Sequence, residues 1–237
     1  MSSSLVFTPP ASDVLTAIAT FQAQDDVVLT LPWRALAITG PDAQTFLQGQ
    51  FTTDLREITP TQSRLGCLLN LKGRVQISGR LLAWPDGYVL LLPEAQFEPA
   101  RARLGKYGVF SKISLSELPL RTQGLIGTGA LHRAASLGLA FPAVTAADPA
   151  SSESINQACS GDSLPLRIRL PGLARGLLLS NAETAPAMTD CAKAGSLEAE
   201  AALQCWEAAA IAAGEWTLDV AETELFQPQE MDYHALH

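Results

Sequence analysis

Short apolar runs at the start of the chain have the composition of β-strands. Val27–Leu31 and Ala35–Thr39 are each about five residues long, and Pro32-Trp33 separates them. Runs of this length, bounded by a proline, are typical of strands rather than helices. The pattern therefore predicts two consecutive strands, with Trp33 between them.

The next apolar positions change to a helical period. After Gly40 permits a turn, Pro41 suits the first position of a helix, because its missing N–H would have no helical partner there. Ala43, Phe46 and Leu47 then recur at the spacing of one helical face. We expect a strand, a tight turn and a short amphipathic helix. A phosphate-binding loop needs more glycines and a free run of N–H donors, so this segment is not predicted to be one.

A longer β-rich stretch follows, from Arg64 to Pro93. Lys72-Gly73 and Pro85-Asp86-Gly87 divide it into three runs, which predicts an antiparallel meander. The pattern then predicts a helix over Pro93–Leu104, ended by the stretch Gly105–Gly108, and a strand over Val109–Leu115.

The second half repeats this mixture of strands and helices. A short strand ending at Gly124–Gly127, a helix over Ala130–Leu137, and a hairpin of Leu166–Leu170 with Gly176–Leu179 are expected. Between them, the stretch 144–163 is small, polar and turn-rich, which favours a loop. Leu197–Ala213 is rich in Ala, Glu and Leu, so it is predicted to be a helix, and the tail after it to be irregular.

Separate meanders and helices predict an α+β fold rather than a doubly wound parallel sheet. The pattern divides the chain near residue 118. An N-terminal α+β part, 1–118, contains the meander, and a second α+β part covers 119–237; interleaving of the two parts stays open.

Composition and charge narrow the class of protein. The chain has 237 residues, 47% of them hydrophobic, and a formal net charge of −8. An acidic chain does not favour direct DNA binding, and the local basic group Arg101, Arg103, Lys106 and Lys112 is interpreted as a solvated helix face. No apolar run is long enough to span a bilayer, and the first residues lack the pattern of a secretory signal, so a cytoplasmic protein without a membrane partner is expected.

The residue types that carry catalysis or metal binding are sparse. Cys67, Cys159, Cys191 and Cys205 form no C-x-x-C pair and have no histidines at ligand spacing, so we expect reduced thiols and no metal site. No serine-hydrolase elbow occurs, and no catalytic residue is assigned. Gly127-Thr128-Gly129 lacks the third glycine of a dinucleotide fingerprint, so an ordinary strand-to-helix turn is favoured over a cofactor loop.

Two tryptophans are the best candidates for ligand binding. Trp33 precedes the Gly40 turn, and Trp206 lies within the Ala-rich helix. Each could be a core aromatic, or both could line a cleft that holds a flat heteroaromatic ligand. Spacing alone does not choose between these alternatives.

The order of the short motifs, taken together, resembles the YgfZ family, folate-binding relatives of the glycine-cleavage T-protein. The segments that carry the resemblance are Trp33, Ile38–Gly40, Phe46–Gln50, Thr52–Asp54, Lys72-Gly73, Lys106–Lys112, Trp206, Ala212–Gly214 and Phe226–Glu230. The resemblance implies a T-protein-like module with ferredoxin-like units around a central folate cleft. It also implies that Trp33 and Trp206 stack on tetrahydrofolate or a derivative.

By the same resemblance, the protein is expected to be a tetrahydrofolate-binding accessory protein. It would support iron–sulfur cluster assembly or maintenance and tRNA modification, with iron–sulfur enzymes of tRNA modification as partners. The family's K-G-C-Y-x-G-Q-E signature and the small β-barrel after it do not occur before His237.

The alternative is a folate-dependent aminomethyltransferase of the glycine cleavage system. In the T-protein, a carboxylate after the Lys-Gly turn lies against the folate. The corresponding positions here are about Ile77 and Ser78, and neither side chain can perform acid–base chemistry of that kind. The accessory protein is therefore the preferred hypothesis.

Overall fold

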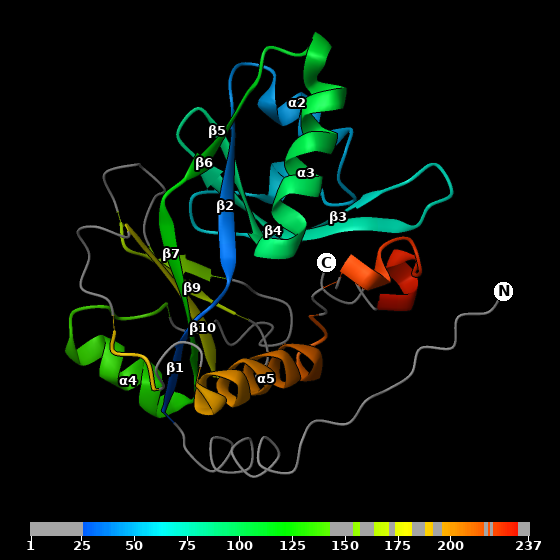
Figure 1. Cartoon of the computed structure of the whole chain (residues 1–237). Coiled ribbons are helices and arrows are strands. Elements are labelled where there is room, and N and C mark those ends of the chain that lie inside the picture. Colours follow the sequence, from blue (N-terminus) through cyan, green and yellow to red (C-terminus); the bar gives the residue numbers. More distant parts are fainter. Residues whose placement is uncertain are drawn as a thin grey trace, which may run out of the picture.

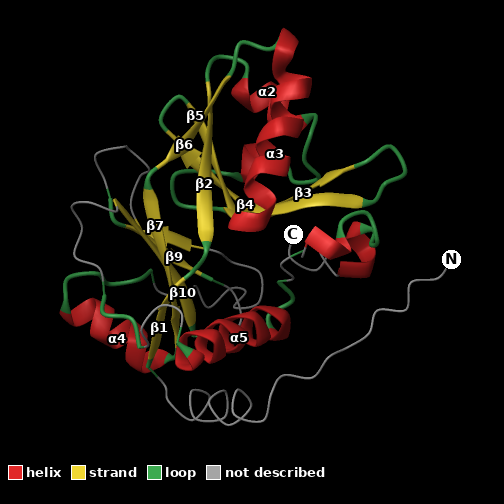
Figure 2. Ribbon diagram, in the orientation of Figure 1, coloured by secondary structure: helices red, strands yellow, loops and turns green. Residues whose placement is uncertain are grey.

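The structure is a computed structural model. It describes residues 26–142, 154–156, 164–170, 174–181, 188–191, 196–215, 218 and 220–231. Two five-stranded sheets form its centre, and helices cover them (Figures 1 and 2). Antiparallel sheets with separate helices confirm the α+β fold class.

The first sheet has the strand order β3-β4-β5-β2-β6. Its strands are β2 (Trp33–Thr39), β3 (Arg64–Leu69), β4 (Val75–Trp84), β5 (Gly87–Pro93) and β6 (Ser114–Leu118). All of its strand pairs are antiparallel. The predicted meander over β3, β4 and β5 is confirmed, with its turns at the two glycine-containing positions.

The second sheet has the strand order β1-β7-β10-β9-β8. Its strands are β1 (Val27–Thr30), β7 (Leu120–Ile126), β8 (Ser154–Asn156), β9 (Leu166–Arg169) and β10 (Arg175–Asn181). The predicted hairpin of β9 and β10 is confirmed by antiparallel pairing from Gly176 with Arg169 to Leu179 with Leu166. β8 is a short strand within the stretch that was predicted to be a loop, and the rest of that stretch lies outside the described residues.

Helices cover both sheets and leave a shared core between them. Helices α2 (Ala43–Gln48) and α3 (Glu94–Tyr107) pack on the outer face of the first sheet, and α4 (Thr128–Ser136) packs on the outer face of the second. Helix α5 (Leu197–Ala212) contributes to the core between the sheets. Figure 1 shows the resulting layers, with α3 at the upper sheet and α4 and α5 at the lower one.

The chain exchanges strands between the two sheets at prolines. β1 belongs to the second sheet, whereas β2, which begins after Pro32, belongs to the first. The chain returns at Pro119, which lies between β6 and β7. A proline has no N–H for a sheet ladder, so it suits a position where pairing stops and the chain changes sheet.

Several predicted boundaries were wrong. Trp33 lies within β2 rather than before it, since it pairs with Pro93 of β5. Pro41 lies in the turn before α2, whose N-cap is Asp42. The Asp42 side chain makes no capping hydrogen bond and instead accepts the N–H of Lys112 at 2.7 Å. Helix α3 runs past the predicted last residue, Leu104, to Tyr107, and Gly108 is its C-cap, so the helix ends within the predicted stretch Gly105–Gly108.

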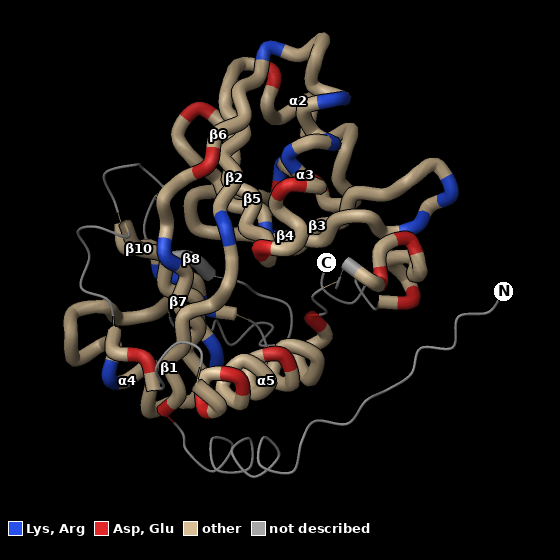
Figure 3. The backbone as a smooth tube through the Cα atoms, in the orientation of Figure 1, with Lys and Arg blue, Asp and Glu red and all other residues tan. Residues whose placement is uncertain are grey.

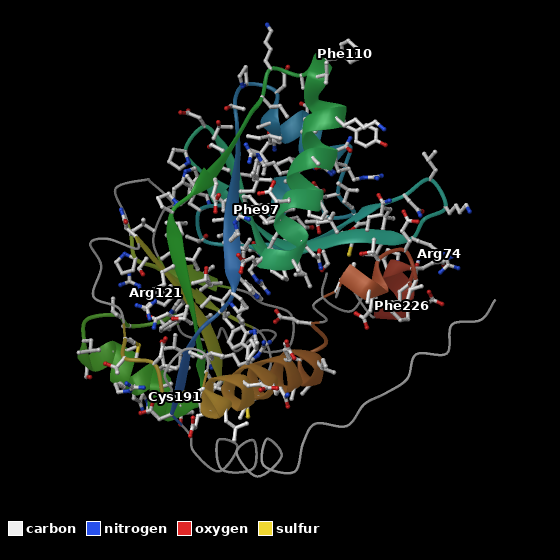
Figure 4. All side chains as sticks on the ribbon, in the orientation of Figure 1. Arg74, Phe97, Phe110, Arg121, Cys191 and Phe226 are labelled. Atoms are coloured by element: carbon white, nitrogen blue, oxygen red, sulfur yellow. The ribbon has the colours of Figure 1, made fainter. Side chains whose placement is uncertain are left out.

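The segment after α3 differs most from its prediction. Val109 and Phe110 were expected to begin a strand, but they lie in a 3-10 turn, Gly108–Phe110. Phe110 is 99% exposed and projects from the tip of the molecule in Figure 4. The apolar character of these residues therefore does not reflect burial in a sheet. Strand pairing begins only at Ser114.

The chain after α5 carries two short 3-10 helices, Val220–Glu222 and Pro228–Met231, and is otherwise irregular in its described part. It packs beside β3 and β4, where Val75 and Phe226 are joined by a backbone hydrogen bond of 2.9 Å. Figure 4 shows Arg74 and Phe226 close together there. Within the described residues, no helix combines the length and the apolar character needed to cross a membrane.

Candidate functional site

The two tryptophans predicted from the sequence lie against each other. Trp33 opens β2 of the first sheet, and Trp206 projects from α5. Their ring centroids are 6.3 Å apart, and the ring planes meet at 81° in an edge-to-face arrangement, which aromatic pairs prefer. Both rings contact the core between the two sheets, and Trp206 is 2% exposed.

A glycine of the second sheet makes room for one of these rings. A Cβ atom on Gly124 of β7 would lie 2.7 Å from Cε3 and 2.8 Å from Cζ3 of Trp206. Such contacts are shorter than any stable packing distance between carbon atoms. Gly124 is therefore required for Trp206 to lie flat against β7.

A buried ionic group borders the tryptophans. Arg80 of β4 donates from Nη2 to Oε1 of Glu215 at 2.5 Å, and Arg175 of β10 donates from Nη2 to Oε2 at 2.7 Å. Glu215 follows the end of α5, so this one carboxylate links the first sheet, the second sheet and the helix. The Arg175 guanidinium carbon also lies 5.4 Å from the Trp206 ring, within the range of a cation–π contact.

The ionic group contains more positive than negative charge. All three side chains are buried, with Arg175 at 0% exposure, and two guanidinium groups face one carboxylate. Nε and Nη1 of Arg175 are buried and have no hydrogen-bond partner within the described residues. A buried, incompletely paired guanidinium favours a nearby acceptor or anion.

Glu215 is ionised in this arrangement. Burial alone would raise its pKa, but attraction to Arg80 and to Arg175, together with hydrogen bonds from both, outweighs burial and lowers the pKa below its usual range. Both of its oxygens are occupied by arginine donors. It is therefore suited to positioning the arginines rather than to accepting a proton.

The tryptophans, together with Arg80 and Glu215 of the ionic group, border a small cavity, here called the tryptophan cleft. Its volume is about 20 Å³, which is room for about one water molecule. The lining residues are Trp33, Leu65, Ser78, Gly79, Arg80, Leu91, Pro93, Trp206, Ala210 and Glu215. A flat bicyclic ligand could enter only if the two indoles moved apart.

Acid–base groups are scarce at this cleft. Ile77 and Ser78, the positions where the T-protein resemblance would require a carboxylate, are both 3% exposed and carry none. Ser78 donates its backbone N–H to Oε1 of Gln96 at 3.1 Å. Glu215 supplies the only carboxylate among the residues that line the cleft, and the two arginines engage it. The arrangement suits binding better than proton transfer.

The other candidate residues lie away from the cleft. Gly127 is the N-cap of α4 with φ +96, so Gly127-Thr128-Gly129 is an ordinary strand-to-helix turn, as expected. His132 is exposed on α4, and His234 and His237 lie outside the described residues. Cys67 and Cys205 are buried, and burial raises the pKa of both thiols. Among the described residues, no three His, Cys, Asp or Glu side chains gather closely enough to hold a metal ion.

Sequence reasoning missed the ionic group entirely. Arg80 of β4 is followed directly by the apolar residues Leu81 and Leu82, and these neighbours could have indicated that it is buried. Arg175 and Glu215 gave no comparable signal. Their pairing depends on how the two sheets and α5 meet, which no local pattern reports.

Comparison with known proteins gives a consistent group of relatives. The chain is 30% identical over 207 residues to the tRNA-modifying protein YgfZ of Escherichia coli and 29% identical over 207 residues to that of Cronobacter sakazakii. Each alignment covers 86% of this chain and 59% of the relative. The chain thus spans less than two thirds of the length of these curated relatives. No protein-family model matches it.

A solved structure supports the fold. The glycine cleavage system aminomethyltransferase T of Bartonella henselae superposes with a TM-score of 0.56 at 17% identity, over 70% of this chain and 45% of that chain. Identity at this level reports the fold alone, which is T-protein-like as expected from the sequence. Activity has to be argued from the residues of the site.

Proposed function

Because the chain belongs to the YgfZ family, we propose that it binds tetrahydrofolate or a derivative at the tryptophan cleft. We further propose that it acts in the cytoplasm as an accessory protein for iron–sulfur cluster assembly or maintenance and for tRNA modification. Iron–sulfur enzymes of tRNA modification would be its partners.

The observation that carries the folate proposal is the meeting of Trp33 and Trp206. Residues from two distant parts of the sequence bring two indole rings to within 6.3 Å of each other at the junction of the sheets. A pterin ring is flat and polarizable, so contact with indole faces gains both apolar burial and stacking energy. Because the cleft holds about 20 Å³, the bound state requires the rings to separate.

The ionic group supports the same proposal. Arg80 lines the cleft, and Arg175 lies beneath Trp206 with buried donors that have no partner in the described chain. When the indoles separate, these guanidinium groups can donate to acceptor atoms of an entering ligand. The proposal therefore uses both the aromatic and the polar sides of the cleft.

Two titrations test folate binding. Tetrahydrofolate and a reduced, stabilised folate such as 5-formyltetrahydrofolate are titrated into the protein by calorimetry, with p-aminobenzoylglutamate as the control that lacks the pterin. We expect binding of the folates and little binding of the control. If neither folate binds at millimolar concentration, the folate proposal is wrong.

A turnover assay separates the accessory role from the aminomethyltransferase. The protein is incubated with an aminomethylated lipoyl carrier and tetrahydrofolate, with a glycine-cleavage aminomethyltransferase as the positive control. No turnover is expected, because the residues lining the cleft offer no free carboxylate for acid–base catalysis. Product formation comparable to the positive control would instead support the transferase.

The cellular role is tested in the organism that encodes the chain. tRNA nucleosides from cells with and without the gene are compared by mass spectrometry. Loss of the gene should lower the modifications that depend on iron–sulfur enzymes. An unchanged set of nucleosides would contradict the proposed role.

A further inference from the structure

A second cavity lies on the other side of Gln96, along the basic face of α3. It is here called the Tyr107 groove, and its volume is about 490 Å³. Its lining residues are Gln76, Ile77, Gln96, Pro99, Ala102, Arg103, Lys106, Tyr107 and Thr223. None of these residues lines the tryptophan cleft. The volume lies within the usual range of small-molecule pockets, about 300–1,000 Å³.

The walls of the groove come from three segments. α3 supplies one side, β4 supplies Gln76 and Ile77, and the segment after α5 supplies Thr223. Gln96 separates the groove from the tryptophan cleft: its side-chain oxygen accepts from Ser78, and its side-chain nitrogen donates to the carbonyl of Leu218. These bonds hold the wall between the two cavities in place. The groove is thus a second candidate site, distinct from the first.

The chemistry of the lining is aromatic and cationic. The guanidinium carbon of Arg103 lies 5.2 Å from the centre of the Tyr107 ring, and Nζ of Lys106 lies 6.0 Å from it. None of the described residues that line the groove carries a carboxylate. Glu224 follows Thr223 of the lining, and a hydrogen bond from Gln76, with a smaller contribution from attraction to Arg103, lowers the pKa of Glu224. Arg103 and Lys106 thus place two positive charges at the groove, although the whole chain carries a formal net charge of −8.

Arg103 has donor capacity that the described chain does not use. Its Nη2 donates to the carbonyl of Leu69 at 3.2 Å, which fixes the guanidinium group at the groove. Its Nε is buried and has no partner among the described residues. A buried N–H without an acceptor is unfavourable, so a ligand oxygen that reached it would gain a strong, charge-assisted bond.

We propose that the Tyr107 groove binds a nucleoside monophosphate, either free or as one unit of a single-stranded RNA. The phosphate lies at Arg103 and Lys106, and the base stacks on the Tyr107 ring. This pairing of a flat ring with an adjacent cation pair is the chemistry by which single nucleotides are held. The acidic remainder of the molecule opposes a long nucleic-acid track, so recognition is limited to one or a few nucleotides. Figure 3 shows both basic and acidic residues along α3, and acidic residues along α5.

The sequence interpretation of this basic group as a solvated face was incomplete. Arg101, with its side chain 51% exposed, does lie on the solvated face, where it meets Glu98 at 4.0 Å. Arg103 and Lys106 instead line the groove. The same helix thus offers a basic residue outside the site as a control for those inside it.

The test uses the protein with four nucleoside 5′-monophosphates, titrated separately and followed by calorimetry or by chemical shifts. Inorganic phosphate and the free nucleosides serve as partial ligands. We expect at least one monophosphate to bind more tightly than both partial ligands, with affinity falling as salt is raised. Lys106→Gln and Tyr107→Leu should each weaken binding by about fivefold or more, and Arg101→Gln by less than about twofold.

Two further measurements distinguish a free nucleotide from RNA as the ligand, and the Tyr107 groove from the tryptophan cleft as the site. A short oligoribonucleotide that binds more tightly than the monophosphate, and that depends equally on Tyr107, identifies RNA as the source; equal or weaker binding identifies the free nucleotide. Trp33→Phe should leave nucleotide binding unchanged whatever it does to folate binding.

Three results would overturn the proposal. The first is the absence of binding by every monophosphate at millimolar concentration. The second is a Lys106→Gln or Tyr107→Leu protein that binds as well as Arg101→Gln. The third is nucleotide binding that Trp33→Phe abolishes, because the ligand would then occupy the tryptophan cleft. All of these substitutions except Trp33→Phe lie on the exposed or half-buried face of α3, so folding is expected to survive them.

Discussion

Glu215 is the residue that joins the most parts of the tryptophan cleft. It is 6% exposed and accepts from an arginine of each sheet. Removing one partner of a buried ionic group leaves the others charged and unpaired, which is more damaging than losing an exposed pair. The stability of the junction between the sheets therefore depends strongly on this side chain.

We predict that Glu215→Gln lowers the free energy of unfolding by about 3–5 kcal/mol, because Arg80 and Arg175 lose their counter-charge. Urea denaturation followed by circular dichroism measures the change. Glu200→Gln, an exposed position of α5, is the control and should change stability by less than about 0.5 kcal/mol. Equal effects from the two substitutions would contradict the role assigned to Glu215.

The same carboxylate predicts a pH dependence with a definite sign. The pKa of Glu215 is lower in the folded protein than in the unfolded chain, since Arg80 and Arg175 favour its charged form. The contribution of Glu215 to the free energy of unfolding is therefore present above the usual glutamate pKa. It is lost as pH falls through the pKa of Glu215 in the folded protein. The stability difference between wild type and Glu215→Gln should stay the same from pH 7 down to the usual glutamate pKa and shrink as pH falls further toward pH 3. A difference that stays constant over this range would argue against the ion pairs.

At the scale of elements, close packing of α5 on β7 depends on Gly124. We predict that Gly124→Ala destabilises the protein by about 1–3 kcal/mol, because the added methyl group meets the Trp206 ring at 2.7 Å. Thermal unfolding and tryptophan fluorescence measure the effect.

Gly105→Ala is the matched control within α3. An added Cβ there meets only Leu115 Cδ1 at 3.8 Å, an ordinary contact. Alanine also has the higher helix propensity, so stability should rise by about 0.5–1 kcal/mol. Destabilisation at Gly105 as large as at Gly124 would show that the packing argument is wrong.

The elements were predictable where a local pattern determines them. The meander could be predicted because Lys72-Gly73 and Pro85-Asp86-Gly87 interrupt apolar runs, and α5 because its residues favour helices throughout. The turn after α3 could not, because Val109 and Phe110 have strand propensity but lie at an exposed tip. Exposure of that kind is set by the tertiary fold, so a local pattern cannot report it.

The site was predictable only in part, for the same reason. Trp33 and Trp206 were identified as candidates, the second by its place in a strong helix, and the structure brings them together. The Arg80–Glu215–Arg175 group was missed, since its members come from both sheets and from the end of α5. The ligand role of the two tryptophans remains a prediction.

At the scale of the whole molecule, the two sheets are not consecutive units of the chain. β1 pairs with β7 along its whole length, from Val27 with Ile126 to Thr30 with Gln123, although β2 to β6 lie between them in sequence. A cut near residue 118 would therefore separate β1 from the sheet that it completes. It would also expose the apolar residues that lie between the two sheets.

We predict that the fragments 1–118 and 119–237, expressed separately, do not fold cooperatively. The second fragment lacks β1, which leaves the edge of β7 unpaired, and each fragment exposes its half of the shared core. Thermal denaturation followed by circular dichroism tests each fragment alone and the two mixed. A sharp unfolding transition from either fragment alone would show that the halves are independent domains.

The most direct test of the central claim, folate binding between the two tryptophans, is the affinity of Trp33→Phe and Trp206→Phe for tetrahydrofolate. Each substitution keeps an aromatic ring but reduces its face, so each should weaken binding by about three- to thirty-fold, which corresponds to ~0.7–2 kcal/mol. Trp206 is buried, so the binding is measured well below the melting temperature of that variant. Trp84→Phe, at the end of β4, is the control and should bind like wild type. Unchanged affinity in both cleft variants, with binding abolished in the Trp84 control, would contradict the account.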